Sequence, residues 1–304
     1  MDLRSIETTL QKAGYCSNKK IDCALYASIL CGRPLLIEGD PGVGKTALAK
    51  AFADGIGAEF IRVQMYEGLT ADQVLYDYDY QKQLLTLEAI RPKLDEAYKD
   101  LSLSEAISSA VKSMDFYGED FLIRRPILRS ITGNTRKVLL IDELDKASEE
   151  TEYMLYEFLE NYSITIPQYG VIRCPEEVRP YVFLTSNSYR DLSGALRRRC
   201  GYLYIEHKTQ EEMTAILTAQ AHADRRLAAG IAKAMVMIQS EPMHRTPSIA
   251  EAVEFAEFLS KNGEVSKELV LNSLSLLIKD RRDEAAVTRI ITANGEEIWT
   301  KEDN

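Results

Sequence analysis

The sequence predicts an α/β protein in which buried strands of an open sheet alternate with helices, followed by a helical C-terminal region. The first indication is an apolar run, Leu35–Ile37, that leads through a glycine-rich stretch into Ala47–Ala53, a run of helix-forming composition. A strand, a loop and a helix in this order begin a parallel α/β unit. The second indication is the run 138–141, whose four consecutive apolar residues are typical of a strand buried on both faces.

The glycine-rich stretch has the pattern of a phosphate-binding loop, with Gly39 and Gly44 followed directly by Lys45 and Thr46. Glycines let backbone N–H groups point inward at an anion, and the next helix adds partial positive charge at its N-terminus. We expect Lys45 to reach the β- and γ-phosphates of a nucleoside triphosphate and the Thr46 hydroxyl to bind Mg²⁺. The flanking strand and helix disfavour a chance match on a surface turn. The predicted phosphate-binding residues are Gly39, Asp40, Pro41, Gly42, Val43, Gly44, Lys45 and Thr46.

Two carboxylates, Asp142 and Glu143, follow the second apolar run. They stand at the C-terminal edge of the predicted strand, where ligands bind in open α/β sheets. We expect Asp142 to bind Mg²⁺ together with Thr46, and Glu143 to polarise an attacking water as general base. An apolar run ending in Asp-Glu is weak evidence alone, but it is strong downstream of a phosphate-binding loop.

A third set of polar residues follows the predicted strand 181–187, which ends in Asn187. An asparagine after a strand is usually a turn residue, but its place in this order predicts that it orients the water or the γ-phosphate. Next come three adjacent arginines, Arg197, Arg198 and Arg199, which cannot all point the same way on a helix. They either form a solvated surface or supply one arginine finger to a neighbouring subunit.

Helices are predicted before the first strand, and the second strand is predicted over 59–64. Gly55 and Gly57 are expected to end the helix that follows the phosphate-binding loop. One face of a helix within residues 1–31 is predicted to be apolar and to consist of Ile21, Leu25, Ile29 and Leu30.

Residues 65–137 are too many for one crossover connection and predict an insertion. We expect a helix around Leu84–Leu87 and further helices up to 121–128. The tyrosines of this insertion either pack with a polar tip or grip a partner; they are Tyr76, Tyr78 and Tyr80.

Beyond the insertion, a helix is predicted over 148–162, with Met154, Leu155, Phe158 and Leu159 on its inner face. A hairpin is predicted at 164–166 and 170–172, and a strand at 202–206. Thr209–Glu212 has the composition of a helix start. Further helices are expected around 216–217, 231–238, 252–259 and 269–278, before a polar tail around Trp299.

Composition limits the function classes. The net charge is −10 over 304 residues, with a pI near 5.1, which disfavours non-specific nucleic-acid binding. No apolar run approaches the roughly 18 residues of a membrane span, so we expect no membrane insertion. Five cysteines without a CxxC pair and a start without signal-peptide character predict free thiols in a reducing cytoplasm. With three histidines, a dedicated zinc site is not expected.

The order of these motifs resembles that of AAA+ ATPases: the loop 39–46, the insertion, the strand 138–143, Thr185–Asn187 and the arginine-rich 196–200. The insertion after the second strand resembles that of the MoxR subgroup. Within it, the chain most resembles the CoxD-like ATPases, which assist maturation of molybdenum hydroxylases such as aerobic carbon monoxide dehydrogenase. The segments that carry this match are 66–69, 121–128, 195–200 and 246–251.

The resemblance implies a five-stranded core at 1–206 with an insertion at about 65–137, a helical lid at 207–292 and a polar tail at 293–304. It also implies a hexameric ring that hydrolyses ATP with Mg²⁺ and acts as a chaperone for a client protein, with Arg199 as the finger. A von Willebrand factor A-type partner is a further implication. Many relatives carry an arginine at the start of the third lid helix, where this chain has Pro247–Ile249. Two alternatives follow: Arg245, just upstream, substitutes for that arginine, or the lid senses nucleotide differently.

Two other function classes compete with a remodelling ATPase: a P-loop enzyme without remodelling activity, such as a nucleotide switch or a kinase, and a DNA-linked motor. A nucleotide switch or other P-loop enzyme is disfavoured because no Asn-Lys-x-Asp guanine motif is present, and the Asp191–Gly194 string lies after the sensor strand. A kinase is disfavoured because Glu143 beside Asp142 favours water as nucleophile. A DNA-linked motor is disfavoured by the net charge of −10.

Overall fold

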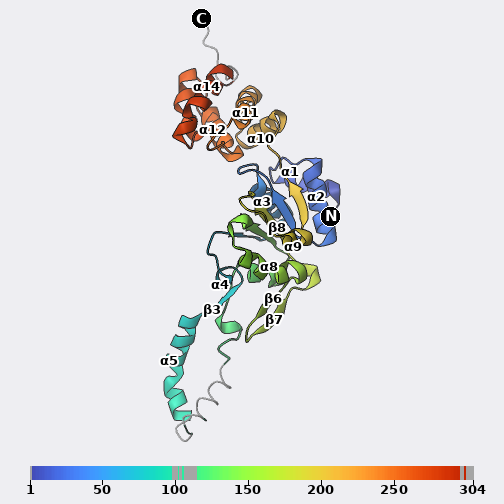
Figure 1. The fold of residues 1–304 in the computed structure, drawn as a ribbon, viewed down its shortest axis with the longest axis vertical. Helices are drawn as coiled ribbons and strands as arrows, with labels where there is room; N and C mark the ends of the chain where they lie inside the picture. Colours follow the sequence, from blue (N-terminus) through green and yellow to red (C-terminus); the bar gives the residue numbers. More distant parts are fainter. Residues whose placement is uncertain (1, 98–101, 103–104, 106–114, 295–297, 299–304) are drawn as a thin grey trace.

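A computed structural model describes residues 2–97, 102, 105, 115–294 and 298. Figure 1 shows an elongated molecule in which the central sheet and the helices that cover it lie in the middle. The C-terminal helices lie at one end, and a helical arm projects from the other end. Among the described residues, no helix is both long enough and apolar enough to cross a membrane.

The central sheet has five parallel strands in the order β2-β5-β8-β1-β9. The strands are β1 (Leu35–Glu38), β2 (Phe60–Gln64), β5 (Val138–Asp142), β8 (Tyr181–Ser186) and β9 (Gly201–Tyr204). β5 lies inside the sheet, between β2 and β8, and every one of its residues is buried. The predicted α/β class with a parallel sheet is therefore confirmed.

Side chains of β5 alternate between two apolar cores on the two faces of the sheet. Val138 and Leu140 pack with the helices α1 (Leu3–Lys12), α2 (Lys19–Cys31) and α3 (Lys45–Ile56). Leu139 and Ile141 pack on the opposite face. The helices of that face are α7 (Pro126–Ile131), α8 (Glu149–Asn161) and α9 (Gly194–Arg199). This two-sided burial explains the unbroken apolar run, as expected for a parallel strand.

Two details of the N-terminal helices differ from the predictions. Gly55 lies inside α3 instead of ending it, and Gly57 is the C-cap with φ 67°. A Cβ at Gly55 would lie 2.5 Å from the Thr9 carbonyl oxygen, so glycine permits the close approach of α1 and α3. On α2, Ile21 and Leu25 are buried as predicted, but Leu30 is 70% exposed, because its position is turned away from their face.

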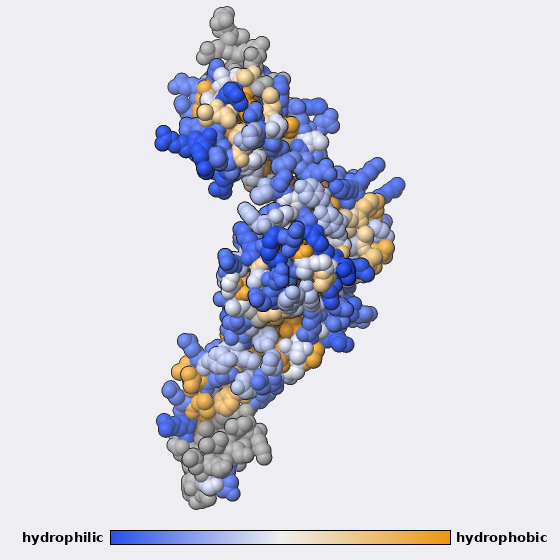
Figure 2. Space-filling model, in the orientation of Figure 1, coloured by the Kyte–Doolittle hydropathy of each residue, from blue (hydrophilic) through white to orange (hydrophobic). Residues whose placement is uncertain are grey.

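The insertion contains more structure than the predicted helices. It comprises α4 (Ala71–Val74), β3 (Tyr76–Tyr78), α5 (Tyr80–Ala97), the 3₁₀ turn η1 (Glu119–Phe121), β4 (Leu122–Arg124) and α7. β3 and β4 form a small antiparallel ribbon, which was not predicted, and α5 forms the projecting arm in Figure 1. Tyr78 is buried, whereas Tyr80 is 60% exposed. Leu84 and Leu85 are also exposed, and Figure 2 shows apolar surface on the arm.

The segment between β5 and β8 matches its prediction closely. The helix α8 begins after the N-cap Ser148, and Met154 of its inner face is only half-buried. The hairpin consists of β6 (Ser163–Ile166) and β7 (Gly170–Arg173). Two short 3₁₀ turns, η2 (Leu144–Lys146) and η3 (Glu176–Val178), connect these elements to β5 and β8.

The C-terminal helices pack around an apolar core of their own. They are α10 (Gln210–Gln220), α11 (Arg225–Ser240), α12 (Ile249–Lys261), α13 (Lys267–Asn272) and α14 (Glu284–Asn294), with 3₁₀ turns η4 (Leu274–Leu276) and η5 (Arg281–Asp283). The predicted helix start is confirmed: Thr209 is the N-cap of α10 and forms a capping box with Glu212. The helix predicted over 269–278 is wrong in extent: α13 ends at Asn272, and the chain continues as the 3₁₀ turn η4.

The predicted polar tail is partly incorrect. α14, which was not predicted, runs through its first residues, and Ile298 is 3% exposed and packs in the C-terminal core. Trp299 lies outside the described residues. The bounds of the core and of the lid stay a prediction.

Candidate nucleotide-binding site

The phosphate-binding loop lies between β1 and α3 and has three glycines with positive φ. The φ angles are 152° at Gly39, 83° at Gly42 and 99° at Gly44. Two of these glycines also permit close approaches. A Cβ at Gly39 would lie 2.4 Å from the Ile205 carbonyl oxygen, and one at Gly42 would lie 2.5 Å from Ser248 Cβ. The loop is therefore in direct contact with the start of α12.

Lys45 is the first residue of α3, and its side chain folds back over the loop. The Lys45 ammonium donates to the carbonyl oxygens of Gly39 and Asp40, at 2.6 and 2.8 Å. Burial lowers the pKa of Lys45, while the carboxylates of Asp145 and Asp40 oppose that shift. The Asp40 carboxylate faces away toward His207, at 2.9 Å, so the loop contributes Asp40 through its backbone.

Asp142 lies at the end of β5 with its side chain almost completely buried. The Thr46 hydroxyl donates to both of its carboxylate oxygens at 3.1 Å. The Thr185 hydroxyl donates to Oδ1, and the Arg62 guanidinium donates to Oδ2 from Nε at 2.9 Å. The structure thus brings the two predicted metal ligands, Thr46 and Asp142, together. Arg62, on the neighbouring strand β2, was missed by the sequence analysis.

Glu143 follows β5 with left-handed backbone, φ 56°. Its N–H donates to Thr185 Oγ1 at 2.9 Å, which holds the end of β5 to β8. Its carboxylate accepts hydrogen bonds from Lys146 at 2.8 Å and Gln64 at 2.9 Å. Burial raises the pKa of Glu143, but the bonds from Lys146 and Gln64 outweigh it, so the pKa lies below its usual value. The group is a carboxylate at neutral pH.

Asn187 lies directly after β8 and faces Glu143, with Nδ2 3.5 Å from Oε1. Its backbone N–H donates to Asp145 Oδ2 at 3.0 Å, and Tyr189 N–H donates to the same atom at 2.9 Å. Asp145 is buried and holds the segment after β8 against the end of β5. The sequence analysis did not identify this role of Asp145, although it lies two residues after Glu143.

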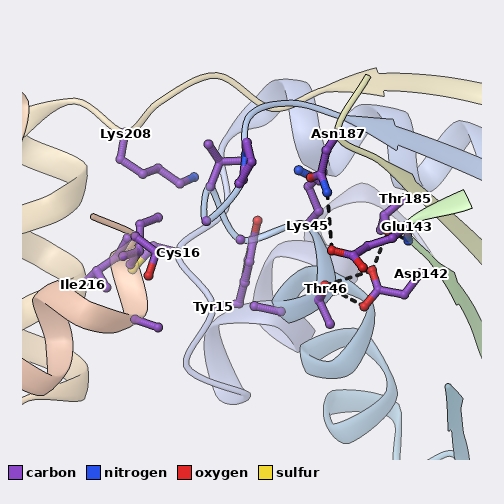
Figure 3. Close-up of a pocket in the computed structure, with 18 of the residues that line it drawn as sticks. Tyr15, Cys16, Lys45, Thr46, Asp142, Glu143, Thr185, Asn187, Lys208 and Ile216 are labelled. Atoms are coloured by element: carbon purple, nitrogen blue, oxygen red, sulfur yellow. Dashed lines mark hydrogen bonds between the residues drawn. The ribbon is translucent and has the colours of Figure 1, made fainter. Parts of the chain in front are cut away.

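These residues line a pocket of about 370 Å³ between the sheet edge and the C-terminal helices. Figure 3 shows Lys45, Thr46, Asp142 and Glu143 at one end and Ile216 of α10 at the other. The pocket is also lined by Tyr15, Cys16, Lys208, Gln220 and Ile249. Of the predicted phosphate-binding residues, those at 41–46 line the pocket, whereas Gly39 and Asp40 do not.

The pocket combines a polar end and a more apolar end, which suits a nucleotide. Tyr15 is buried, and its hydroxyl has no hydrogen-bond partner within the described part of the chain. Lys208 lies over the Tyr15 ring, 5.8 Å from its centroid, and points into the pocket in Figure 3. Neither Tyr15 nor Lys208 belongs to a recognisable motif, so only the tertiary structure identifies them.

The three arginines of α9 point in different directions, as predicted. Arg197 binds Glu38 through two nitrogens, at 2.7 and 3.2 Å. Arg199 binds Glu160 at 2.8 Å and lies over the Tyr156 ring, 4.7 Å from its centroid. Arg198 is exposed and has no ion pair with any residue that the structure describes. None of the three lines the pocket of its own subunit.

Arg245 also lies outside the pocket lining, and its side chain is exposed. Its backbone N–H donates to Asp283 at 2.8 Å. The lid residues in the pocket beside the loop are instead those at the start of α12, Ser248 to Ala250. The Ile249 N–H donates to the Gly42 carbonyl oxygen at 3.3 Å.

The donor set fits MgATP. The loop offers glycine backbone and the start of α3 to phosphates. Thr46 and Asp142 offer hard oxygen atoms, which Mg²⁺ prefers, and Mg²⁺ usually takes only one or two protein ligands beside phosphate and water. Across the described ranges there is no cluster of three or more His, Cys, Asp or Glu side chains that could hold a metal ion.

Comparison with known proteins gives the family. Residues 34–200 match the model of the AAA domain (dynein-related subfamily), more than half of the chain. The chain belongs to this family. Membership implies an AAA+ ATPase that binds and hydrolyses nucleotide.

Individual proteins match less extensively. A stretch of 45 residues is 42% identical to midasin of Giardia intestinalis, covering 15% of this chain. The chain spans only about 1% of the length of that curated relative. Two structures of RuvB variants of Thermotoga maritima are each 19% identical, with TM-scores of 0.44 and 0.45. They cover 93% and 90% of this chain, and 71% and 74% of the RuvB chains.

Proposed function

We propose that this AAA+ ATPase is of the MoxR type and works as an oligomeric, hexameric ring that uses ATP hydrolysis to remodel or mature a client protein. The observation that carries this proposal is the contact between the phosphate-binding loop and the C-terminal helices. Gly42 packs against Ser248, and both line the same pocket as Glu143. The phosphate-binding loop therefore contacts the C-terminal helices, which we propose move when ATP is hydrolysed.

In the proposed mechanism, Lys45 releases the carbonyl oxygens of the loop and binds the β- and γ-phosphates. Glu143 exchanges its bonds to Lys146 and Gln64 for a water molecule and accepts its proton as general base. Asn187, which faces Glu143, orients that water. The lowered pKa of Glu143 keeps it ionised at neutral pH.

Thr46 and Asp142 would hold Mg²⁺, which supplies charge neutralisation of the phosphates when bound. Their mutual hydrogen bonds keep both oxygen ligands on one side of the pocket. Asp142 is buried, so its orientation is fixed by the protein rather than by solvent.

Arg199 is proposed to reach the γ-phosphate of a neighbouring subunit. Its location on α9, outside the lining of the pocket of its own subunit, supports a role in trans. Arg199 would exchange its bond to Glu160 for the phosphate. Arg198, which is exposed and forms no ion pair with a described residue, is the competing candidate. A finger of this kind contributes roughly 10³–10⁵ in rate.

The finer assignment rests on the resemblance to CoxD-like ATPases. It proposes a molybdenum-containing hydroxylase or its metal centre as client, a von Willebrand factor A-type partner and a cytoplasmic location. The projecting arm α5, with exposed Leu84 and Leu85, supports contact with another protein. The net charge of −10 is consistent with no nucleic-acid partner.

The test measures the size of Glu143→Gln by light scattering with and without MgATP. This variant should bind ATP, hydrolyse it slowly and shift to a ring-sized species with MgATP. Lys45→Ala, which loses its phosphate contact, is the matched control and should stay small. A monomer under all nucleotide conditions and concentrations would contradict the ring. It would favour the alternative, a P-loop NTPase or nucleotide switch without remodelling activity.

A further inference from the structure

We propose that Arg62 is an internal competitor of the divalent metal ion for Asp142, and therefore sets the Mg²⁺ concentration that nucleotide binding requires. The inference rests on the proposed role of Asp142 as metal ligand. It concerns a residue outside the motifs that the sequence analysis identified.

The position of Arg62 follows from the pairing of β2 with β5. Arg62 lies two residues before Gln64, which is in register with Asp142. Both side chains leave the same face of the strand toward the pocket. The Arg62 guanidinium therefore reaches Asp142 Oδ2 with two nitrogens, Nε at 2.9 Å and Nη2 at 2.7 Å.

The carboxylate of Asp142 has no free side for a metal ion. Thr46 donates to both oxygens, Thr185 donates to Oδ1, and Arg62 covers Oδ2. A cation that binds beside Thr46 would have to take over a carboxylate lone pair that one of these donors uses. The two hydroxyls can rotate and remain neighbours of a metal ion, whereas the guanidinium carries a like charge and is repelled by it.

Arg62 is also able to leave. Its side chain is 44% exposed and lines the pocket, whereas that of Asp142 is 3% exposed. The guanidinium can therefore swing into solvent while Asp142 stays in place. Solvent screens the exposed guanidinium, so the competition is a modest and measurable effect.

The test is equilibrium binding of a fluorescent ATP analogue, mant-ATP, titrated with buffered free Mg²⁺. In Arg62→Gln, the Mg²⁺ concentration for half-maximal binding should fall about fivefold, while binding in EDTA stays unchanged. Arg62→Lys keeps the charge but loses the two-nitrogen contact. Its Mg²⁺ concentration for half-maximal binding should lie between those of the wild type and Arg62→Gln. The matched control is Arg129→Gln, because Arg129 forms an exposed ion pair with Glu59 outside the pocket.

Two results would overturn the inference. An unchanged Mg²⁺ requirement in Arg62→Gln would show that the ion pair does not compete with the metal ion. An equal loss of mant-ATP affinity with Mg²⁺ and in EDTA would show that Arg62 binds the nucleotide itself. Asp142→Asn separates this failure from failure of the proposed function. If that variant keeps the wild-type Mg²⁺ dependence, Asp142 is not the metal ligand.

Discussion

Glu143 shows how single side chains prepare the site. Its left-handed backbone turns the carboxylate out of the β5 direction, and the Thr185 hydroxyl fixes its N–H. Lys146, three residues later, then holds the carboxylate by an ion pair. The same contact raises the pKa of Lys146. The residue pattern Glu-x-x-Lys on a short 3₁₀ turn is therefore part of the site.

Lys146→Ala should make stability less sensitive to acid. The pKa of Glu143 is lowered in the folded protein, so its ion pair stabilises the fold above the unfolded pKa and is lost as pH falls through the folded pKa. We expect the variant to melt about 1–2 °C lower at pH 7, and the difference to shrink once the pH falls below about 4.3, the ordinary pKa of glutamate.

Thermal denaturation of both proteins from pH 7 to about pH 3, below the ordinary glutamate pKa, measures this effect. Lys12→Ala is the control for a general surface effect, because Lys12 lies exposed at the end of α1 and forms no ion pair with a residue that the structure describes. A melting difference that stays constant over this range would contradict the contribution of Glu143.

At the scale of elements, close helix packing depends on glycines at crossing points. The approach of α1 to α3 requires Gly55, because any Cβ there would meet Thr9 at 2.5 Å. α1 and α3 cover the same face of the sheet, and α3 begins at Lys45 directly after the phosphate-binding loop. Their spacing therefore supports the position of Lys45.

Gly55→Ala should destabilise the protein, although alanine is favoured in a helix by about 1 kcal/mol. The overlap with the Thr9 backbone forces α1 to move, and overpacking of this kind costs about 1–3 kcal/mol. Gly194→Ala on α9 is the matched control, because nothing lies within 4 Å of the added Cβ. Thermal melting should show a loss for Gly55→Ala alone; equal stability of both variants would contradict this account.

At the scale of the whole molecule, the site joins three regions of the chain. Tyr15 comes from the segment between α1 and α2, Asp142 from the sheet, and Ile216 and Ile249 from the C-terminal helices. Figure 3 shows the C-terminal helices facing the phosphate-binding loop across the pocket. Arg199, by contrast, lies outside it, which makes the proposed catalysis a property of the assembly.

Mixing two inactive variants tests catalysis between subunits. Arg199→Ala and Glu143→Gln should each lose most ATPase activity alone. In a mixed ring, a subunit with intact Glu143 can meet a neighbour with intact Arg199, at roughly a quarter of the interfaces of a random equal mixture. Steady-state ATPase measurements should therefore show partial recovery after mixing.

The corresponding Arg198→Ala mixture serves as the control for the choice of arginine. Recovery with Arg198→Ala, together with full activity of Arg199→Ala alone, would move the finger to Arg198. No recovery with either arginine variant, in rings shown by light scattering to have mixed, would contradict catalysis in trans.

The local order of residues predicts the fold class and the polar end of the site. Unbroken apolar runs specify strands buried on both faces, and the glycine, lysine and threonine spacing specifies the loop, because both depend on local residue order. It also placed Asp142 and Glu143 at the strand edge. The parallel sheet confirms the fold, and the catalytic roles stay predictions.

The other side chains of the site are brought together by strand pairing and helix packing. Arg62 reaches Asp142 because β2 pairs with β5, and Asp145 holds Asn187 because β5 pairs with β8. Tyr15 and Lys208 enter the pocket from segments far apart in the chain. None of these residues forms a local pattern, since their neighbours are set by strand order and helix packing.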